Sequence, residues 1–124
     1  MKSFDIDGAY RLAGNLLKVI QNGELAALSD FGVSHAIYEE ITEELERSGE
    51  NVETLTIPPY AAAFQPDSTG RIPFYGYEME ADPQSKRVAS QLWSGGQKTD
   101  LTLIADYTER QGETSLTFRL LETQ

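Results

Sequence analysis

Apolar residues recur at helical spacing in the first part of the chain. Between residues 5 and 22 they stand three or four positions apart, which places them on one face of a helix. The pair Asn22-Gly23 predicts the end of this helix, because glycine adopts the left-handed conformation that closes a helix. A short helical turn is expected over residues 24–28, before Asp30-Phe31-Gly32 interrupts it. The apolar stripe consists of Ile6, Ala9, Tyr10, Ala13, Leu16, Leu17 and Ile20.

A second long helix is predicted from residue 34 to residue 48. Ser34 is a typical N-cap, because its hydroxyl accepts a hydrogen bond from a free amide of the first turn, and Ser48-Gly49 ends the segment. The apolar positions again fall on one face. Both helices are therefore expected to cover an apolar surface elsewhere in the fold. The second stripe consists of Ile37, Tyr38, Ile41 and Leu45.

Beyond residue 52 the apolar and polar residues alternate with the period of a β-strand. Residues 52–57 predict a short strand before Pro58-Pro59, whereas residues 60–64 are ambiguous. A hairpin is predicted next, with its tight turn at Asp82-Pro83-Gln84-Ser85. The first strand of the hairpin places one set of side chains on an apolar face, namely Tyr75, Tyr77, Met79 and Ala81. The returning strand carries Val88, Ser90 and Leu92 on one face.

Two further strands complete the predicted sheet, over residues 101–107 and 116–120, with turns at residues 94–97 and 110–113. The fold predicted is α+β, because helices come first and an antiparallel meander follows. We expect one domain over residues 1–124, helical over 5–48 and sheet over 52–123. In it, two main N-terminal helices and a short helical turn pack on one face of a four- or five-stranded antiparallel sheet.

This layout resembles a known group of folds. A helix, the turn Asn22-Gly23-Glu24-Leu25, a second helix and a long meander are similar to the small cystatin-like α+β domains related to the nuclear transport factor 2 superfamily. Leu92-Trp93-Ser94 followed by Lys98-Thr99-Asp100-Leu101-Thr102-Leu103 resembles the closing hairpin of an uncharacterised group of short bacterial domains. The resemblance implies a cystatin-like sheet. Because this chain is short, it implies at most a cramped version of the cone-shaped pocket of larger relatives.

Composition limits the ligands and the kinds of site that this chain can have. Among the 124 residues, 20 acidic side chains oppose 10 basic ones, and the net charge of −10 has the wrong sign for direct binding to nucleic acid or an anionic membrane. The chain has no cysteine and one histidine, His35, so thiolate chemistry and sites with two imidazoles are excluded. We expect no metal and no cofactor. Acidic residues near the N-terminus and the lack of a long apolar stretch predict a cytoplasmic protein.

The strongest local feature is an excess of glutamate over the second helix and its exit. Seven glutamates lie between residues 39 and 53, with Arg47 as the one basic residue among them, and Glu43–Arg47 is expected to pair at i,i+4 spacing. This surface is interpreted either as a solvated helix face or as a docking face for a basic partner. The partner-binding residues predicted are Glu39, Glu40, Glu43, Glu44, Glu46 and Glu50, with Trp93 as an apolar anchor or, alternatively, a side chain packed at the end of the sheet.

The leading hypothesis is a non-enzymatic, cytoplasmic bacterial protein that neutralises a basic protein partner, as a toxin immunity protein does; a mimic of nucleic acid is a second version. No catalytic motif is present, so no catalytic residue is assigned. Asp100 and Asp106 are expected to face solvent, opposite the apolar side of their strand. One alternative is a pocket domain of the nuclear transport factor 2 type that binds or transforms a small apolar ligand, lined by Tyr75, Tyr77 and Tyr107. Another is a homodimer that pairs through sheet faces or edges.

Overall fold

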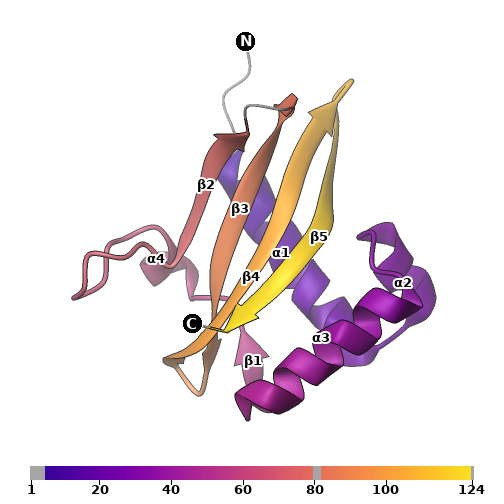
Figure 1. Cartoon of the computed structure of the whole chain (residues 1–124). Helices are drawn as coiled ribbons and strands as arrows, with labels where there is room; N and C mark the ends of the chain where they lie inside the picture. Colours follow the sequence, from indigo (N-terminus) through magenta and orange to yellow (C-terminus); the bar gives the residue numbers. More distant parts are fainter. Residues whose placement is uncertain (1–4, 80–81, 124) are drawn as a thin grey trace.

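The computed structural model describes residues 5–79 and 82–123. Its N-terminal helices pack against a curled antiparallel sheet, which confirms the α+β fold (Figure 1). In Figure 1, α1 crosses behind the sheet and α3 lies beside one end of β5. The elements are α1 (Ile6–Asn22), α2 (Leu25–Asp30), α3 (His35–Ser48), the 3₁₀ turn η1 (Val52–Thr54), β1 (Leu55–Thr56), α4 (Tyr60–Ala63), β2 (Phe74–Met79), β3 (Asp82–Ser94), β4 (Gln97–Arg110) and β5 (Glu113–Thr123).

The two long helices begin and end where the sequence predicts. The side chains of Asp5 and Ser34 each accept a hydrogen bond from the amide three residues further on, which caps α1 and α3. Gly23 and Gly49 follow the two helices with φ angles of 69° and 78°, a conformation that residues with a Cβ adopt at a cost. Local capping chemistry therefore fixes the length of both helices.

The sheet is built on two long central strands. β3 pairs with β4 and β4 with β5, all antiparallel, while β1 and β2 both pair with β3 along different parts of its length. β5 is an edge strand, and the loop after α2 covers part of that edge, because the amide of Phe118 donates to the carbonyl of Phe31 at 2.8 Å. Pairing of a second copy along a sheet edge stays a prediction.

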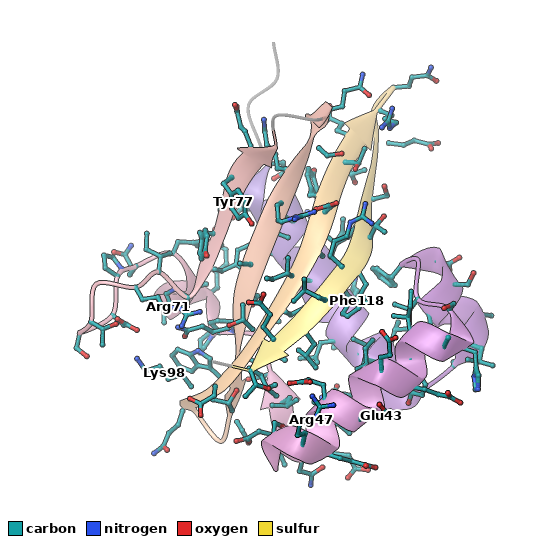
Figure 2. The ribbon with its side chains drawn as sticks, viewed as in Figure 1. Glu43, Arg47, Arg71, Tyr77, Lys98 and Phe118 are labelled. Carbon is teal, nitrogen blue, oxygen red and sulfur yellow. The ribbon has the colours of Figure 1, made fainter. Side chains whose placement is uncertain are left out.

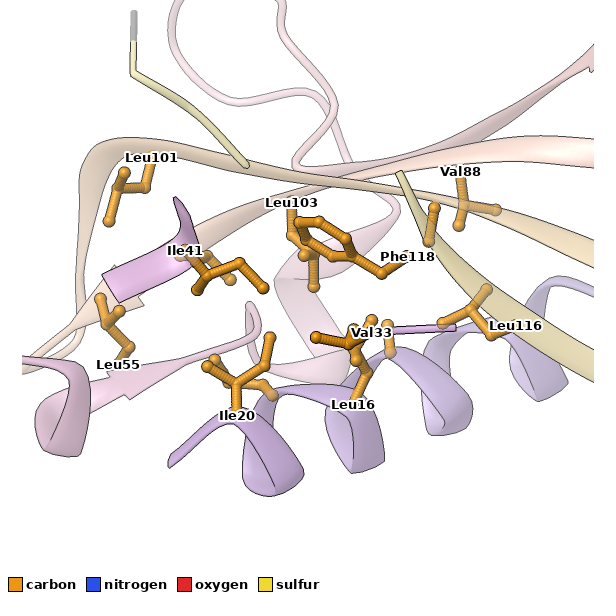
Figure 3. Packing of buried hydrophobic residues seen from close by; sticks show 14 of the residues in the cluster. Leu16, Ile20, Val33, Ile41, Leu55, Val88, Leu101, Leu103, Leu116 and Phe118 are labelled. Atoms are coloured by element: carbon orange, nitrogen blue, oxygen red, sulfur yellow. The ribbon is translucent and has the colours of Figure 1, made fainter. Parts of the chain in front are cut away.

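The core lies between the helices and one face of the sheet, which we call the helix face. Figure 3 shows Leu16 and Ile20 on α1 directed toward Leu103 and Phe118 of the sheet, with Ile41 of α3 beside them. Each such side chain contributes about 1.5–3 kcal/mol when it is fully buried. A void among the core side chains of α1, α3 and the sheet measures about 10 Å³. That space is too small for an organic ligand.

Two local predictions need correction. The turn expected at residues 82–85 is wrong, because these residues belong to β3, where Ser85 pairs with Thr108 of β4. Ala81, expected on the first hairpin strand, lies outside the described residues. The strand expected over residues 52–57 is reduced to Leu55–Thr56 behind a 3₁₀ turn, which Asn51 caps through its side chain. The ambiguous residues 60–64 contain the short helix α4.

Candidate functional site

The structure presents two polar surfaces that lie close to each other. One is the acidic groove, between α3 and β5. The other is the polar groove on the open face, which is the face of β2–β5 opposite the core. Arg119 lines both grooves.

The position of α3 determines which of its glutamates are exposed. Ile41 and Leu45 are buried against the core, so the positions between them on the helix turn outward. Figure 2 shows Glu43 and Arg47 on α3 beside the end of β5. Of the glutamates predicted to bind a partner, Glu44 and Glu50 are half-buried, whereas the exposed ones are Glu39, Glu40, Glu43 and Glu46.

The acidic groove has a volume of about 250 Å³. One wall comes from α3 and the other from β5, and the two elements are in contact. Apolar side chains of both elements form part of the lining, next to the carboxylates. The lining residues are Ile37, Glu40, Ile41, Glu43, Glu44, Arg47, Phe118, Arg119, Leu120 and Leu121. An apolar surface beside several carboxylates suits a long basic side chain.

Within the groove, Arg47 forms an ion pair with Glu44. The sequence had predicted a pair with Glu43 instead. The distance from Arg47 Nη1 to Glu44 Oε2 is 2.9 Å at i,i+3 spacing. Thr123 of β5 also donates to Glu44, which draws that carboxylate toward the sheet. Within residues 5–79 and 82–123, Glu40 and Glu43 therefore have no ion-pair partner.

The histidine at the start of α3 is also part of this surface. The distance from His35 Nε2 to Glu39 Oε1 is 2.9 Å, and both side chains are exposed. The pair carries an opposite-charge attraction only when the ring is protonated. The contact places Glu39 beside the other glutamates at the exposed side of the helix.

Trp93 lies apart from the acidic groove. It is half-buried on β3, and its indole Nε1 donates to Gln91 Oε1 at 3.3 Å on the open face. Thr56 of β1 and Lys98 of β4 are its neighbours across the strands. The structure therefore does not bring Trp93 together with the glutamates of α3.

The three tyrosines proposed to line a pocket lie on different faces of the sheet. Tyr75 and Tyr77 are 40% and 46% exposed on the open face, where their rings stack with centroids 6.1 Å apart. Tyr107 is buried on the helix face, and burial raises its pKa. The alternation of β2 places Phe74 in the core, which turns the two neighbouring tyrosines outward. The three rings therefore do not line one cavity.

An ion cluster occupies the middle of the open face. Asp106 of β4 is 3% exposed, although the alternation predicted that it would face solvent. It does lie on the open face, but Arg87 of β3 and Arg119 of β5 cover it, each through its Nε atom. Asp100, the other aspartate expected to face solvent, is exposed.

The arginines fix the charge of Asp106. Burial alone would raise the pKa of its carboxyl, but hydrogen bonds and opposite charges from Arg87 and Arg119 outweigh this effect and lower the pKa. The hydrogen bond to Asp106 raises the pKa of Arg87, and nearby Tyr77 raises it further. The sequence signal for this cluster was one charged residue on each of three neighbouring strands, with Arg87 opposite Asp106 and Arg119 two residues beyond Thr117, the partner of Asp106 on β5. It was recognisable only with the register known.

The polar groove extends from this cluster toward the turn between β4 and β5, with a volume of about 530 Å³. Hydroxyl side chains dominate its lining, and the hydroxyls of Ser85 and Thr108 lie 2.8 Å apart across the strands. The lining residues are Ser85, Asp106, Thr108, Arg110, Glu113, Thr114, Ser115, Thr117 and Arg119. Sequence reasoning missed this surface, because serine and threonine in strands carry no motif.

In the described part of the chain, no three histidine or acidic side chains are close enough together to hold a metal ion. None of the helices there combines the length and the apolar composition that crossing a membrane requires.

Comparison with known proteins gives the chain no assignment. No family model, no curated protein and no solved structure matches it.

Proposed function

We propose that this protein is a binding module that takes a basic segment of a protein partner into the acidic groove between α3 and β5. The observation that carries this proposal is the pair Glu40 and Glu43. Both carboxylates line the groove, and neither has an ion-pair partner within the described residues. A lysine or arginine side chain of a partner would supply the missing counter-charge.

The shape of the groove supports an extended basic side chain. Ile37 of α3 and Leu121 of β5 offer apolar contact to the methylene groups of lysine or arginine, and the carboxylates of Glu40 and Glu43 receive the charged end. A volume of about 250 Å³ accommodates one or two such side chains. Arg47 does not compete for this place, because Glu44 already binds it.

The charge of the whole chain acts in the same direction. A net charge of −10 attracts a basic partner over distances of up to the screening length, about 8–10 Å at physiological salt. Exposed carboxylates on one helix concentrate this field. We therefore expect fast association that weakens steeply as salt is added.

Binding of this kind inhibits a partner by occupying its basic surface, and it requires no chemistry from the module. A bacterial cytoplasmic immunity protein that blocks the basic cleft of a toxin is the form of this function that we propose. The order of helices before a curled sheet is also what the cystatin-like domains related to nuclear transport factor 2 would have. That relation remains part of the proposal.

A labelled lysine- and arginine-rich peptide tests the proposal directly. Its binding is followed by fluorescence anisotropy for the wild type and for a Glu40→Gln/Glu43→Gln variant. The matched control is Glu24→Gln/Glu53→Gln, which removes the same charge from exposed positions outside the groove. We expect the groove variant to bind at least about tenfold more weakly than the control. Equal binding by the two variants would show that net charge alone attracts the peptide, and the proposal would fail.

A further inference from the structure

The ion cluster on the open face carries a charge opposite to that of the protein as a whole. The cluster of Arg87, Asp106 and Arg119 sums to one positive charge, in a chain whose net charge is −10. The other two charged residues of the polar groove, Arg110 and Glu113, face each other across the strands and offset one another. The charged residues that line the polar groove therefore sum to zero, and Arg87 beside them adds one positive charge on a protein that is acidic overall.

Arg119 supplies the groups that can bind a ligand there. Its Nε donates to Asp106, which fixes the plane of the guanidinium, and the side chain remains 50% exposed. Within the described residues, its two terminal amino groups have no hydrogen-bond acceptor of their own. A guanidinium fixed in this way presents a planar pair of donors, the geometry that matches a carboxylate or a phosphate.

Asp106 holds this arrangement in place. Its carboxylate is 4% exposed and is bound from both sides, by Arg87 at 2.9 Å and by Arg119. It cannot rotate away without leaving two arginines unpaired on the face of the sheet. Asp106 is therefore a positioning residue, because it acts on a ligand through Arg119.

The remaining lining identifies the kind of ligand. Thr117 flanks Asp106 across the strands, and Ser85 and Thr108 lie one position further along the same face. Hydroxyls donate and accept hydrogen bonds, so they bind hydroxyl groups better than they bind apolar surface. A volume of about 530 Å³ is within the range of small-molecule sites.

We propose that the polar groove binds a small hydroxylated organic anion. Arg119 binds its carboxylate or phosphate, and the hydroxyls of Ser85, Thr108 and Thr117 bind its polar remainder. This site goes beyond the function proposed above, although Arg119 also lines the acidic groove. It lies on the open face of the sheet, and it requires positive charge where the acidic groove requires negative charge.

The test uses nuclear magnetic resonance of the whole chain, with backbone amides as the probes. Sodium phosphate is titrated in one arm and sodium gluconate, a hydroxylated carboxylate, in the other, while sodium chloride keeps the ionic strength constant. We expect saturable shifts confined to residues 85–87, 106–110 and 113–119 in at least one arm. The anion whose titration saturates at the lower concentration, phosphate or the carboxylate gluconate, is the preferred one.

Variants make the result specific. Arg119→Gln is expected to weaken binding about tenfold or more, and Arg119→Lys to restore part of it, because lysine keeps the charge but loses the planar fork. The control Arg11→Gln, on the exposed side of α1, should leave binding unchanged. Shifts that do not saturate, or that the Arg119→Gln and Arg11→Gln variants reduce equally, would overturn the proposal.

The same variants separate this site from the acidic groove. Glu40→Gln/Glu43→Gln is expected to abolish peptide binding while it preserves or strengthens binding of the anion, because it removes nearby negative charge. Loss of anion binding in this variant, with retention in Arg119→Gln, would contradict the assignment to the polar groove. Failure of peptide binding alone would leave the anion site unaffected.

Discussion

The acidic groove and the polar groove use charge in opposite ways. On α3 most of the exposed charges are negative, and Glu40 and Glu43 are left without an ion-pair partner among the described residues. On the open face, Arg87 and Arg119 bind the buried Asp106 at short distance, so most of the charge is compensated internally. The first surface is suited to attracting a partner from a distance. The second fixes side-chain positions, and a defect in it should affect stability first.

Charge reversal in the acidic groove should produce the largest change in binding. In Glu40→Lys/Glu43→Lys, two attractive contacts with a basic peptide become repulsive, and we expect binding to fall about 100-fold or more at low salt. Fluorescence anisotropy with the labelled basic peptide measures the effect. The loss should shrink as salt is raised, since screening weakens attraction and repulsion alike. A loss that is independent of salt would indicate a damaged fold instead, which circular dichroism would detect.

Breaking the ion cluster should produce the largest change in stability. Asp106→Asn keeps the shape of the side chain but removes the charge that holds Arg87 and Arg119, and we expect a loss of about 1–3 kcal/mol in the free energy of unfolding. Urea denaturation measures it. Asp100→Asn, at an exposed position of the same strand, serves as the control and should change stability by less than about 0.5 kcal/mol. Equal effects of the two substitutions would mean that the cluster contributes nothing of its own.

The ion cluster also predicts a dependence on pH. Because the folded protein lowers the pKa of Asp106, the stability from its charged form is present above the unfolded pKa of about 3.9. It is lost as the pH falls through the lower, folded value. The stability difference between the wild type and Asp106→Asn should therefore be full at pH 7 and shrink below about pH 4. A difference that stays constant down to pH 2 would show that the charge of Asp106 is not what stabilises the fold.

The same contrast explains how far the sequence predicts the structure. Asp5, Ser34, Gly23 and Gly49 act locally, and the helices they bound were predicted correctly. The acidic surface was also predictable, because helical spacing alone determines which residues of α3 share a face. The sequence did not predict which glutamate pairs with Arg47. Thr123, at the far end of the chain, donates a hydrogen bond to Glu44 and draws it toward β5.

The features of the sheet that depend on strand register were missed. The tight turn expected at residues 82–85 was wrong because Asp82 pairs with Met79 of β2 and Ser85 pairs with Thr108 of β4, so the segment continues as a strand. The open face could not be recognised, because Arg87, Asp106 and Arg119 are far apart in sequence and meet only when three strands align. Tyr75 and Tyr77 were assigned to an apolar face for the same reason, since a shift of one residue exchanges the two faces.

The smallest predicted effect tests whether the acidic surface is maintained at a cost to the fold. Glu39 and Glu43, and likewise Glu40 and Glu44, stand at i,i+4 spacing, where like charges destabilise a helix by about 0.2–0.5 kcal/mol for each pair. Glu43→Gln removes one such repulsion and leaves the Glu44–Arg47 pair intact, so the variant should be more stable by a few tenths of a kcal/mol. Thermal unfolding at low salt measures this gain, which should vanish at high salt. If the variant is more stable and also binds the basic peptide more weakly, the repulsion within α3 is the consequence of a surface arranged for a partner. If it is less stable, Glu43 contributes to the fold itself, and its role in docking loses its support.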